Sequence, residues 1–324
     1  MKELIFSSSF FYPFLLMFVC LAFGYTLSRG GRVRQGGKEI LQAVIWNLAL
    51  PCLSFTAFMQ DISLADIQRG AWVLTSSLLL YLGFIYLGKA VFRSVGQSKA
   101  AVASLMGAIG QVTLFTLPLL SAMERTDAVF FCGLITLPFR FVLYFLAYPM
   151  ILSEKNFKVR IKKALLTPVM IAMILGLVCW LCQNALVVGN VRVLRLDESA
   201  SAVYAVMKLL ASTVCPLAMI LVGLILGETK VSDAFRDPLA WGASLLRSVV
   251  CPLVVFGIVS IFPGIFDSEA RLALVLGFAA PASVTICTFA MAAGKEERLA
   301  SRITALSTVL SLFTIPILTV LTVS

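Results

Sequence analysis

The sequence predicts an all-α integral membrane protein with ten transmembrane helices, arranged as two inverted five-helix repeats whose fourth and ninth helices are broken at prolines. Composition and block length carry the first part of this prediction. Of the 324 residues, 60% are hydrophobic and 13% are charged, whereas soluble domains carry roughly 25% charged residues. The apolar residues form blocks of about 20, the length that a helix needs to cross a bilayer core of ~30 Å. Transmembrane β-barrels show short alternating segments instead.

Charged or Gly/Pro-rich loops separate the ten predicted spans. The spans cover residues 8–28, 39–59, 70–92, 99–121, 128–152, 164–187, 201–227, 238–262, 270–293 and 301–323. The first repeat is expected to occupy residues 1–155 and the second, inverted repeat residues 156–324, within one membrane domain. The charged stretch Ser153 to Lys163 is the predicted join between them.

Basic residues concentrate in the loops that follow alternate spans, most clearly at Arg29 to Lys38 and at Lys155 to Lys163. The positive-inside rule places such loops on the cytoplasmic side, so we expect a multi-pass protein of the cytoplasmic (inner) membrane with both termini outside. The same rule accounts for the net charge of +10. A nucleic-acid partner is therefore not expected.

Enzyme chemistry is not predicted for this chain. It has no histidine, no paired intramembrane carboxylates and no Walker-type glycine loop. Its eight cysteines all fall inside apolar blocks, where cysteine behaves as a small hydrophobe. The pair Cys179 and Cys182 resembles a metal or redox motif, but without a second pair or histidine it indicates ordinary packing. We expect no cofactor and no metal.

Prolines give the clue to internal order. Pro51 and Pro118 are separated by nearly the same number of residues as Pro216 and Pro281. The two halves therefore look like repeats, and because each has five spans, the second copy must enter the membrane in the opposite sense. Inverted repeats of this kind are common in secondary transporters.

The breaks at Pro118 and Pro281 are the predicted substrate site. A proline inside a span removes a backbone donor and frees carbonyls that hydrocarbon cannot satisfy, so polar neighbours are needed. Broken helices at matching positions of two repeats point to a midplane binding site, although packed proline kinks are the alternative interpretation. Polar side chains near the two breaks are Gln111, Thr113, Thr116, Ser283, Thr285 and Thr288.

Intramembrane charge is the second signal, because an ion at the bilayer centre costs at least ~2.5–3.5 kcal/mol. All sixteen Asp and Glu residues lie in loops or at span ends, whereas Arg140, Lys208 and Arg247 lie inside spans. Uncompensated positive charge favours an anionic ligand. Lys208 is close enough to a span end to snorkel to the surface, and Arg140 has the alternative role of bonding carbonyls at a broken helix end.

Two kinds of ion coupling are compatible with this site. Sodium could be held by hydroxyls and freed carbonyls, for which Thr113, Ser283, Thr285 and Thr288 are the candidates. Proton coupling would have to use the carboxyl group of the substrate itself or residues at the span ends, because the usual intramembrane proton relay is absent.

Several short motifs, in order along nearly the whole chain, are typical of one family. They are Gly24-Tyr25, Asn47-Leu-Ala-Leu-Pro51, Gln111 ahead of Pro118, Thr167-Pro168, Arg247 ahead of Pro252, Ala279-Ala280-Pro281 and the stretch from Leu299 to Pro316. With these motifs the chain resembles the auxin efflux carrier family of membrane transporters, which includes bacterial permeases and the plant PIN auxin exporters.

The resemblance implies ten helices whose fourth and ninth members cross at prolines. It adds Asn47, Pro51 and Thr167 to the expected substrate-binding residues. The chain departs from the family at Gln111, where asparagine is usual, and at Thr167, where many members have asparagine before proline. Because those positions contact substrate in the family, the substrate is expected to differ from auxin; bacterial members are commonly linked to dicarboxylates such as malonate or malate. A homodimer is implied by resemblance only.

The leading hypothesis is a carrier that moves a small organic anion, such as a dicarboxylate or an auxin-like carboxylate, by alternating access. A ligand-binding membrane sensor or receptor of the same fold is the alternative, and a channel is disfavoured because no ring of pore charges is present. The expected partners are the anion and membrane lipids. The predicted substrate-binding residues are Gln111, Thr113, Pro118, Arg247, Pro281, Ser283, Thr285, Asn47, Pro51, Thr167 and Arg140.

Overall fold

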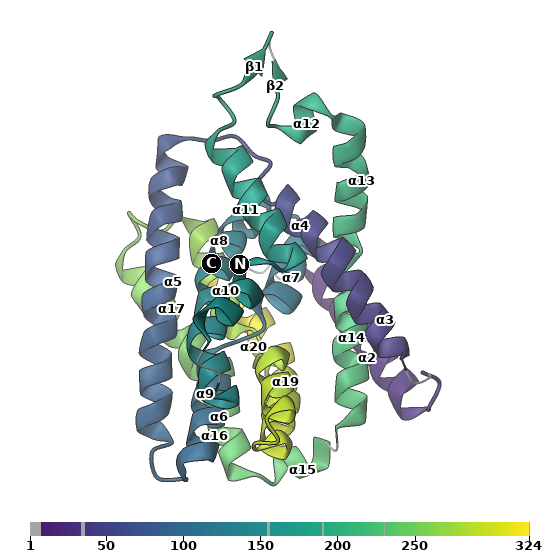
Figure 1. Cartoon of the computed structure of the whole chain (residues 1–324), viewed down its shortest axis with the longest axis vertical. Helices are drawn as coiled ribbons and strands as arrows, with labels where there is room; N and C mark the ends of the chain where they lie inside the picture. Colours follow the sequence, from purple (N-terminus) through teal and green to yellow (C-terminus); the bar gives the residue numbers. More distant parts are fainter. Residues whose placement is uncertain (1–7, 34–35, 154–155, 190, 230, 324) are drawn as a thin grey trace.

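The computed structural model describes residues 8–33, 36–153, 156–189, 191–229 and 231–323, and helices dominate this described part (Figure 1). The predicted repeat boundary at residue 155 lies outside it. In the first half the helices are α2 (Ser8–Arg29), α3 (Gly37–Val44), η1 (Ile45–Ala49), α4 (Leu50–Thr56), α5 (Leu64–Val91), α6 (Gln97–Ala108), η2 (Val112–Thr116), α7 (Leu117–Ala122), α8 (Thr126–Val142), η3 (Leu143–Ala147) and α9 (Tyr148–Leu152).

The second half adds a short antiparallel hairpin to its helices. Its elements are α10 (Phe157–Leu165), α11 (Pro168–Leu181), β1 (Val187–Val188), β2 (Val191–Arg192), α12 (Leu196–Ser199), α13 (Ser201–Ser212), α14 (Val214–Glu228), α15 (Val231–Phe235), α16 (Pro238–Leu245), η4 (Leu246–Val250), α17 (Cys251–Ile261), α18 (Ser268–Ala279), α19 (Val284–Ala292) and α20 (Glu297–Val323).

Seven helices of the described chain are long and apolar enough to cross a bilayer, and an eighth is added if the bent pair α10 and α11 counts as one span. This is fewer than the ten spans expected. The difference arises because the predicted fourth and ninth spans are each divided into two short helices, α6 with η2–α7 and α18 with α19.

The stretch from Ser153 to Lys163 was expected to be a loop, and that expectation is wrong for its described part. It contains most of α10, which meets α11 at an angle of 68°. Asn156 begins the helix by accepting a hydrogen bond from the amide of Lys158 (3.0 Å). Lys162 and Lys163 lie in the last turn, where the helix dipole favours positive charge.

Four wide π-turns in the described helices each stand directly ahead of a proline. The amide of the residue that follows each of η1, η2, η3 and η4 bonds the carbonyl five residues back. That residue is in turn followed by a proline: Pro51, Pro118, Pro149 or Pro252. Proline cannot donate and clashes with the carbonyl four residues earlier, so the preceding turn widens instead of breaking. These prolines therefore shape helices that continue through them.

The helices pack in two groups, which we call the first bundle and the second bundle. The first bundle contains α2, α3, η1, α4, α11, α13 and α14, and the second contains α5, α6, α8, α9 and α16 to α20 (Figure 1). Each bundle takes helices from both halves of the sequence. η2 and α7 lie where the second bundle meets α14 of the first.

Glycines set the distance between α2 and α14, the most extensively packed helix pair of the first bundle. A Cβ atom on Gly223 would lie 2.2 Å from the carbonyl oxygen of Leu21, and one on Gly24 would lie 2.2 Å from that of Ile220. A Cβ atom on Gly227, one turn after Gly223, would lie 2.4 Å from the Cβ atom of Ser28 on α2. Small residues four apart let membrane helices approach backbone to backbone, where van der Waals packing holds them.

Loops rich in basic residues gather at one end of the bundles, the lower end in Figure 1. There Lys38 forms an ion pair with Glu228 (2.6 Å), and Lys295 donates to the carbonyl of Ile151 (3.0 Å). The hairpin β1–β2 and α12 lie at the opposite end. The two ends of the molecule therefore differ in charge, as the positive-inside rule requires of loops on opposite sides of a membrane.

The substitution Gly223→Ala is expected to destabilise the protein by about 1–3 kcal/mol, because the added methyl group overpacks the α2–α14 contact. Thermal unfolding in detergent measures the effect as a lower Tm. Gly257→Ala is the matched control, since nothing lies within 4 Å of a Cβ there and alanine favours a helix interior. An unchanged Tm for Gly223→Ala would contradict the close backbone contact.

Candidate functional site

The two broken helices meet at their breaks. After α6 ends, the chain runs extended through Gly110, and after α18 ends it runs extended through Ala282; these two residues form an antiparallel bridge. The amide of Gln111 donates to the carbonyl of Pro281 (2.8 Å). Backbone groups freed by the breaks thus pair with each other, which a hydrocarbon environment demands. We call this region the crossover.

Arg247 binds the carbonyl ends of both broken helices. Its guanidinium, which is fully buried, donates to the carbonyl oxygens of Ala280 (2.7 Å), Ala108 (2.8 Å) and Gly277 (2.8 Å). Those oxygens lie at or near the C-terminal ends of α18 and α6, where the helix dipole is negative. The carbonyl-bonding role that the sequence put forward for Arg140 thus belongs to Arg247.

Gly110 is the residue that makes room for this guanidinium. A Cβ atom at Gly110 would lie 1.9 Å from Nη2 of Arg247 and 2.3 Å from its Cζ atom. The guanidinium could not move aside for this Cβ atom, because three hydrogen bonds hold it in place. Glycine is therefore required here by close approach, and not by a left-handed backbone conformation.

Gln111 connects the first break to the second half of the other broken helix. Its side chain is buried, and Oε1 accepts a hydrogen bond from the amide of Val284 (3.1 Å), the first residue of α19. The amide of Ser283 donates to the carbonyl of Ile109 (3.1 Å). Gln111, from the other half of the chain, thus satisfies the first amide of α19 as a capping side chain would.

Helix α20 supports the crossover with two serines that sequence reasoning did not single out. Oγ of Ser307 accepts from the amide of Ala282 (3.0 Å), and Oγ of Ser311 donates to the carbonyl of Ala279 (3.0 Å). The sequence feature that could have identified these serines is the recurrence of hydroxyl residues along one face of the last span. Such hydroxyls satisfy backbone groups that a break exposes in a membrane helix.

Two hydroxyl groups at the crossover have no hydrogen-bond partner in the described structure. They belong to Thr113 and Ser283, both buried. They stand at the start of η2 and just ahead of α19, where the first amides of a helix lack intrahelical partners and carry partial positive charge. The crossover therefore holds donors suited to an anion.

A narrow cavity of about 10 Å³ lies at the crossover, between the two bundles. Its volume is that of roughly one water-sized sphere. The crossover contributes Gln111, Pro281, Ala282 and Val284; α14 contributes Val222, Ile225 and Leu226; and α20 contributes Thr304 and Thr308. The bundles are therefore nearly in contact at this point.

Arg140 differs from Arg247 in what surrounds it. Its side chain is 3% exposed, and its Nε and Nη2 atoms have no hydrogen-bond partner. The guanidinium lies over the ring of Trp46, 5.0 Å from the centroid, and beside the hydroxyl of Tyr144. Trp46 belongs to η1 in the first bundle, whereas Arg140 ends α8 in the second. An unneutralised guanidinium thus lies between the bundles.

Three predicted site residues have local roles in the described structure. Asn47 donates through Nδ2 to the carbonyl of Ala43 (2.9 Å), within its own helix. Pro51 follows the π-turn η1. Thr167 is the N-cap of α11 and accepts from the amide of Met170 (3.3 Å). These contacts do not join the three residues to the crossover.

The remaining predicted residues lie near the breaks or at the surface. The prediction of a break at Pro118 is wrong. Pro118 is buried at the start of α7, which continues η2, and the first break lies at residues 109–111 instead, because the π-turn accommodates the proline. Thr285 is half-buried in the first turn of α19. Lys208 is exposed on α13. The structure therefore brings together Gln111 and Pro281 in direct contact, with Arg247 against both helix ends.

The sequence model of a family described as "Membrane transport protein" matches residues 9–160 and 151–319, nearly the whole chain. The chain belongs to this family. It is accordingly a multi-pass membrane transporter of the auxin efflux carrier type, which confirms the resemblance seen in the sequence motifs. No curated protein sequence matches the chain.

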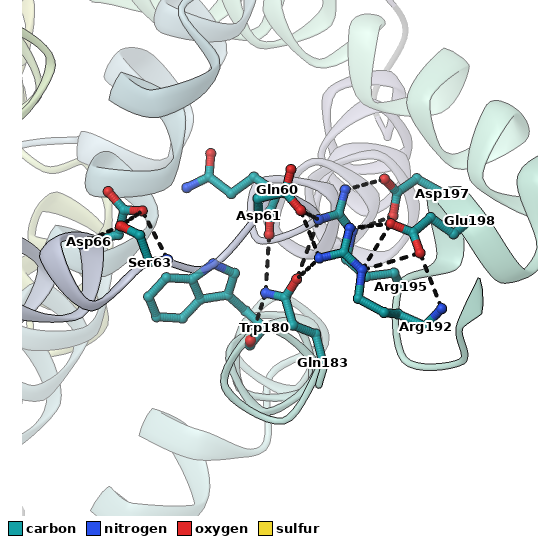
Figure 2. A network of polar contacts seen from close by, with 10 residues as sticks. All are labelled: Gln60, Asp61, Ser63, Asp66, Trp180, Gln183, Arg192, Arg195, Asp197 and Glu198. Atoms are coloured by element: carbon teal, nitrogen blue, oxygen red, sulfur yellow. Dashed lines mark hydrogen bonds and ion pairs between the residues drawn. The ribbon is translucent and has the colours of Figure 1, made fainter. Parts of the chain in front are cut away.

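At the end away from the basic loops, this transporter has a dense network of ion pairs (Figure 2). Asp61, between α4 and α5, pairs with Arg192 (2.7 Å) and with Arg195 (3.0 Å). Arg192 also pairs with Glu198 and donates to Oε1 of the buried Gln183 (2.9 Å). Each of these arginines has an acidic partner, so the network ties the hairpin to the α4–α5 loop and has no unpaired arginine to offer a ligand.

Charge pairing in this network changes the acidity of its carboxyl groups. Hydrogen bonds from the side chain and then the backbone of Arg192 lower the pKa of Glu198 to about 2. The Arg192 hydrogen bond likewise lowers the pKa of Asp61. A carboxyl group with a depressed pKa stabilises the folded state above its unfolded pKa, and that stabilisation is lost as the pH falls through the folded pKa.

Gly110→Ala is expected to prevent stable folding or to lower Tm strongly, because the methyl group would displace the Arg247 guanidinium from its three carbonyls. Gly277→Ala is the matched control: it lies in the same region, and its Cβ would meet Ile135 only at 3.7 Å, an ordinary contact. Yield of monodisperse protein and thermal unfolding provide the comparison. Equal stability of the two variants would contradict the placement of Arg247.

Glu198→Gln is expected to reduce the loss of thermal stability that accompanies acidification from about pH 4.5 toward pH 2. Above that window the variant should be less stable than the parent, because it lacks the ion pair. Glu39→Gln is the control, since Glu39 has no arginine partner in the described structure. Parallel Tm–pH curves for Glu198→Gln and the parent would show that the network does not hold Glu198.

Proposed function

We propose that this transporter is a carrier that moves a small organic anion across the membrane by alternating access. The observation that carries the proposal is the state of Arg140, a buried guanidinium with two nitrogens that lack hydrogen-bond partners. Burying such a charge away from water is costly unless a partner of opposite charge or a hydrogen-bond acceptor compensates it. A carboxylate can accept two parallel hydrogen bonds from a guanidinium and supplies the missing negative charge.

The other buried arginines are already occupied. Arg247 donates to carbonyls, and Arg195 pairs with Asp61 and Asp197. Among the described residues with buried side chains there is no aspartate or glutamate. The interior thus has an excess of positive charge, which supports an anionic rather than a cationic substrate.

The crossover supports a carrier with ten crossings in two inverted repeats. One broken helix comes from each half of the chain, and the two breaks pair in antiparallel fashion around Gly110 and Ala282. Half-helix ends directed toward a central site are the arrangement in which transporters hold anionic substrates. In this proposal the basic loops face the cytoplasm and both termini lie outside the inner membrane.

The contact between the bundles supports alternating access. The crossover cavity of about 10 Å³ is too small for an organic anion, since ligand pockets usually have volumes of 300 Å³ or more. Movement of the second bundle against the first would widen the space bounded by Gln111, α14 and α20, and it would carry Arg140 past Trp46. The interface between the bundles is thus the surface that has to open.

Substrate class and coupling complete the proposal. Arg140 would take one carboxylate of a dicarboxylate or an auxin-like carboxylate, while the first amides of η2 would take polar groups of the remainder. The hydroxyls of Thr113 and Ser283, which have no partner in the described structure, would be available to a sodium ion or to the substrate.

Uptake of labelled dicarboxylates and monocarboxylates into proteoliposomes tests the carrier. Arg140→Gln should lower kcat/KM about tenfold or more, since a charge-assisted hydrogen bond contributes about 1.5–3 kcal/mol. Arg140→Lys should retain part of the flux, because it keeps the charge without the planar fork. Lys208→Gln removes an exposed charge and should leave the flux unchanged.

Two results would overturn the proposal. Saturable binding of the anion without flux would identify a receptor rather than a carrier. Full flux in Arg140→Gln, with correctly folded protein, would remove Arg140 from the substrate site. Sodium and pH gradients imposed across the same vesicles distinguish the two kinds of coupling.

A further inference from the structure

A second cavity lies at the end of the molecule that bears the basic loops, away from the crossover. Its volume is about 960 Å³. It lies between the end of α5, the start of α6, the end of α9 and the loop after α19. Lining residues are Lys89, Arg93, Gln97, Ser98, Ala100, Ala101, Val102, Met150, Ile151, Ser153 and Lys295. We call it the basic pocket.

The charged part of the basic pocket is entirely positive. Lys89, Arg93 and Lys295 line it, and none of its described lining residues is acidic. None of the three forms an ion pair in the described part of the chain. Lys295 is held in place by the carbonyl of Ile151 (3.0 Å) and by Oγ of Ser153 (3.3 Å). Three cations therefore converge on one space without a protein counter-charge.

The start of α6 adds donors to the same space. Its N-cap is Gly96, which has no side chain to cover the first amides, and Gln97 and Ser98 of the first turn line the pocket. Helix N-termini bind phosphate through free amides and the helix dipole. Combined with the three cations, this end of α6 favours a ligand with phosphate groups over one with a single weak charge.

The other part of the lining is apolar. Ala101, Val102 and Met150 face the cavity beside the charged groups. Tyr86, one turn before Lys89 on α5, is 69% exposed, and Lys89 lies over its ring at 5.8 Å. Exposed tyrosines and lysines of this kind mark the boundary between the bilayer and water. A ligand with a charged head and an apolar body fits this lining.

We propose that the basic pocket binds the phosphate headgroup of an anionic phospholipid, with a preference for one that carries two phosphates, such as cardiolipin. Basic pockets between membrane helices on the cytoplasmic side take such headgroups. The lipid would contact the outer ends of both half-helices of the crossover, because α6 runs from the pocket to the first break and α19 runs from the second break to the loop with Lys295. Bound lipid thus clamps the two half-helices together.

Lipid binding is measured on the purified, delipidated full chain. Thermal unfolding in phosphatidylcholine nanodiscs with and without cardiolipin, together with native mass spectrometry of retained lipid, gives affinity and stoichiometry. We expect cardiolipin to raise Tm and to bind more tightly than phosphatidylglycerol, with phosphatidylcholine weakest. The triple variant Lys89→Gln, Arg93→Gln, Lys295→Gln should bind cardiolipin at least tenfold more weakly, since each surface cation contributes about 1 kcal/mol to anionic lipid binding.

A matched triple variant, Arg32→Gln, Lys158→Gln, Lys162→Gln, removes the same charge from exposed positions outside the pocket lining and should retain cardiolipin. Ala101→Phe fills the pocket without changing charge, and it serves if the first triple variant folds poorly; it should also lose the lipid.

Three results would overturn the proposal. They are equal loss of cardiolipin in both triple variants, unchanged binding in the pocket variants, and competition by inorganic phosphate or glycerol phosphate with no preference for lipid, which would identify a soluble phosphate ligand. None of these measurements depends on a transported substrate, so they stand or fall separately from the carrier proposal.

Discussion

Arg247 donates hydrogen bonds to three carbonyl oxygens at the ends of α6 and α18, and this contact makes two broken helices tolerable inside a membrane. A carbonyl left without a donor in hydrocarbon costs several kcal/mol, and a guanidinium left without acceptors there is also costly. Each removes the penalty of the other. Gly110 and the hydroxyls of α20 are placed around this contact, and the pairing of the breaks follows from it.

The hydrogen bonds of Arg247 to helix-end carbonyls distinguish it from Arg140, the other arginine inside an apolar span. Arg140 stands over Trp46 between the bundles with two nitrogens that lack partners. The two arginines are chemically identical, and both lie in apolar spans. Their difference comes from acceptors: helix-end carbonyls converge on Arg247, whereas an aromatic ring and one hydroxyl lie beside Arg140. One therefore holds the fold together, and the other is the proposed contact for a carboxylate.

The two ends of the transporter use their charges in opposite ways. At the hairpin end, Arg192 and Arg195 share Asp61, Asp197 and Glu198, so charge joins loops that are far apart in sequence. At the other end, the cations of the basic pocket have no acidic partner among the described lining residues. Paired charges thus connect distant loops, whereas the unpaired charges line the pocket for which we propose a ligand. α6 and α19 connect the basic pocket, where we propose that a phospholipid binds, to the crossover.

The sequence by itself determined the helical membrane class, the family and the break at Pro281, because hydropathy and proline chemistry act within a single helix. The break predicted at Pro118 lies instead around Gly110, and the helix continues through Pro118. The π-turns ahead of four prolines follow from the same local rule. Only the tertiary structure decided that Arg247 rather than Arg140 binds the helix ends, and that each bundle mixes helices of both halves. It also decided that Gly110 must lack a side chain. Each of these features depends on residues that are distant in sequence but adjacent in the folded protein. Only long-range packing brings those residues together.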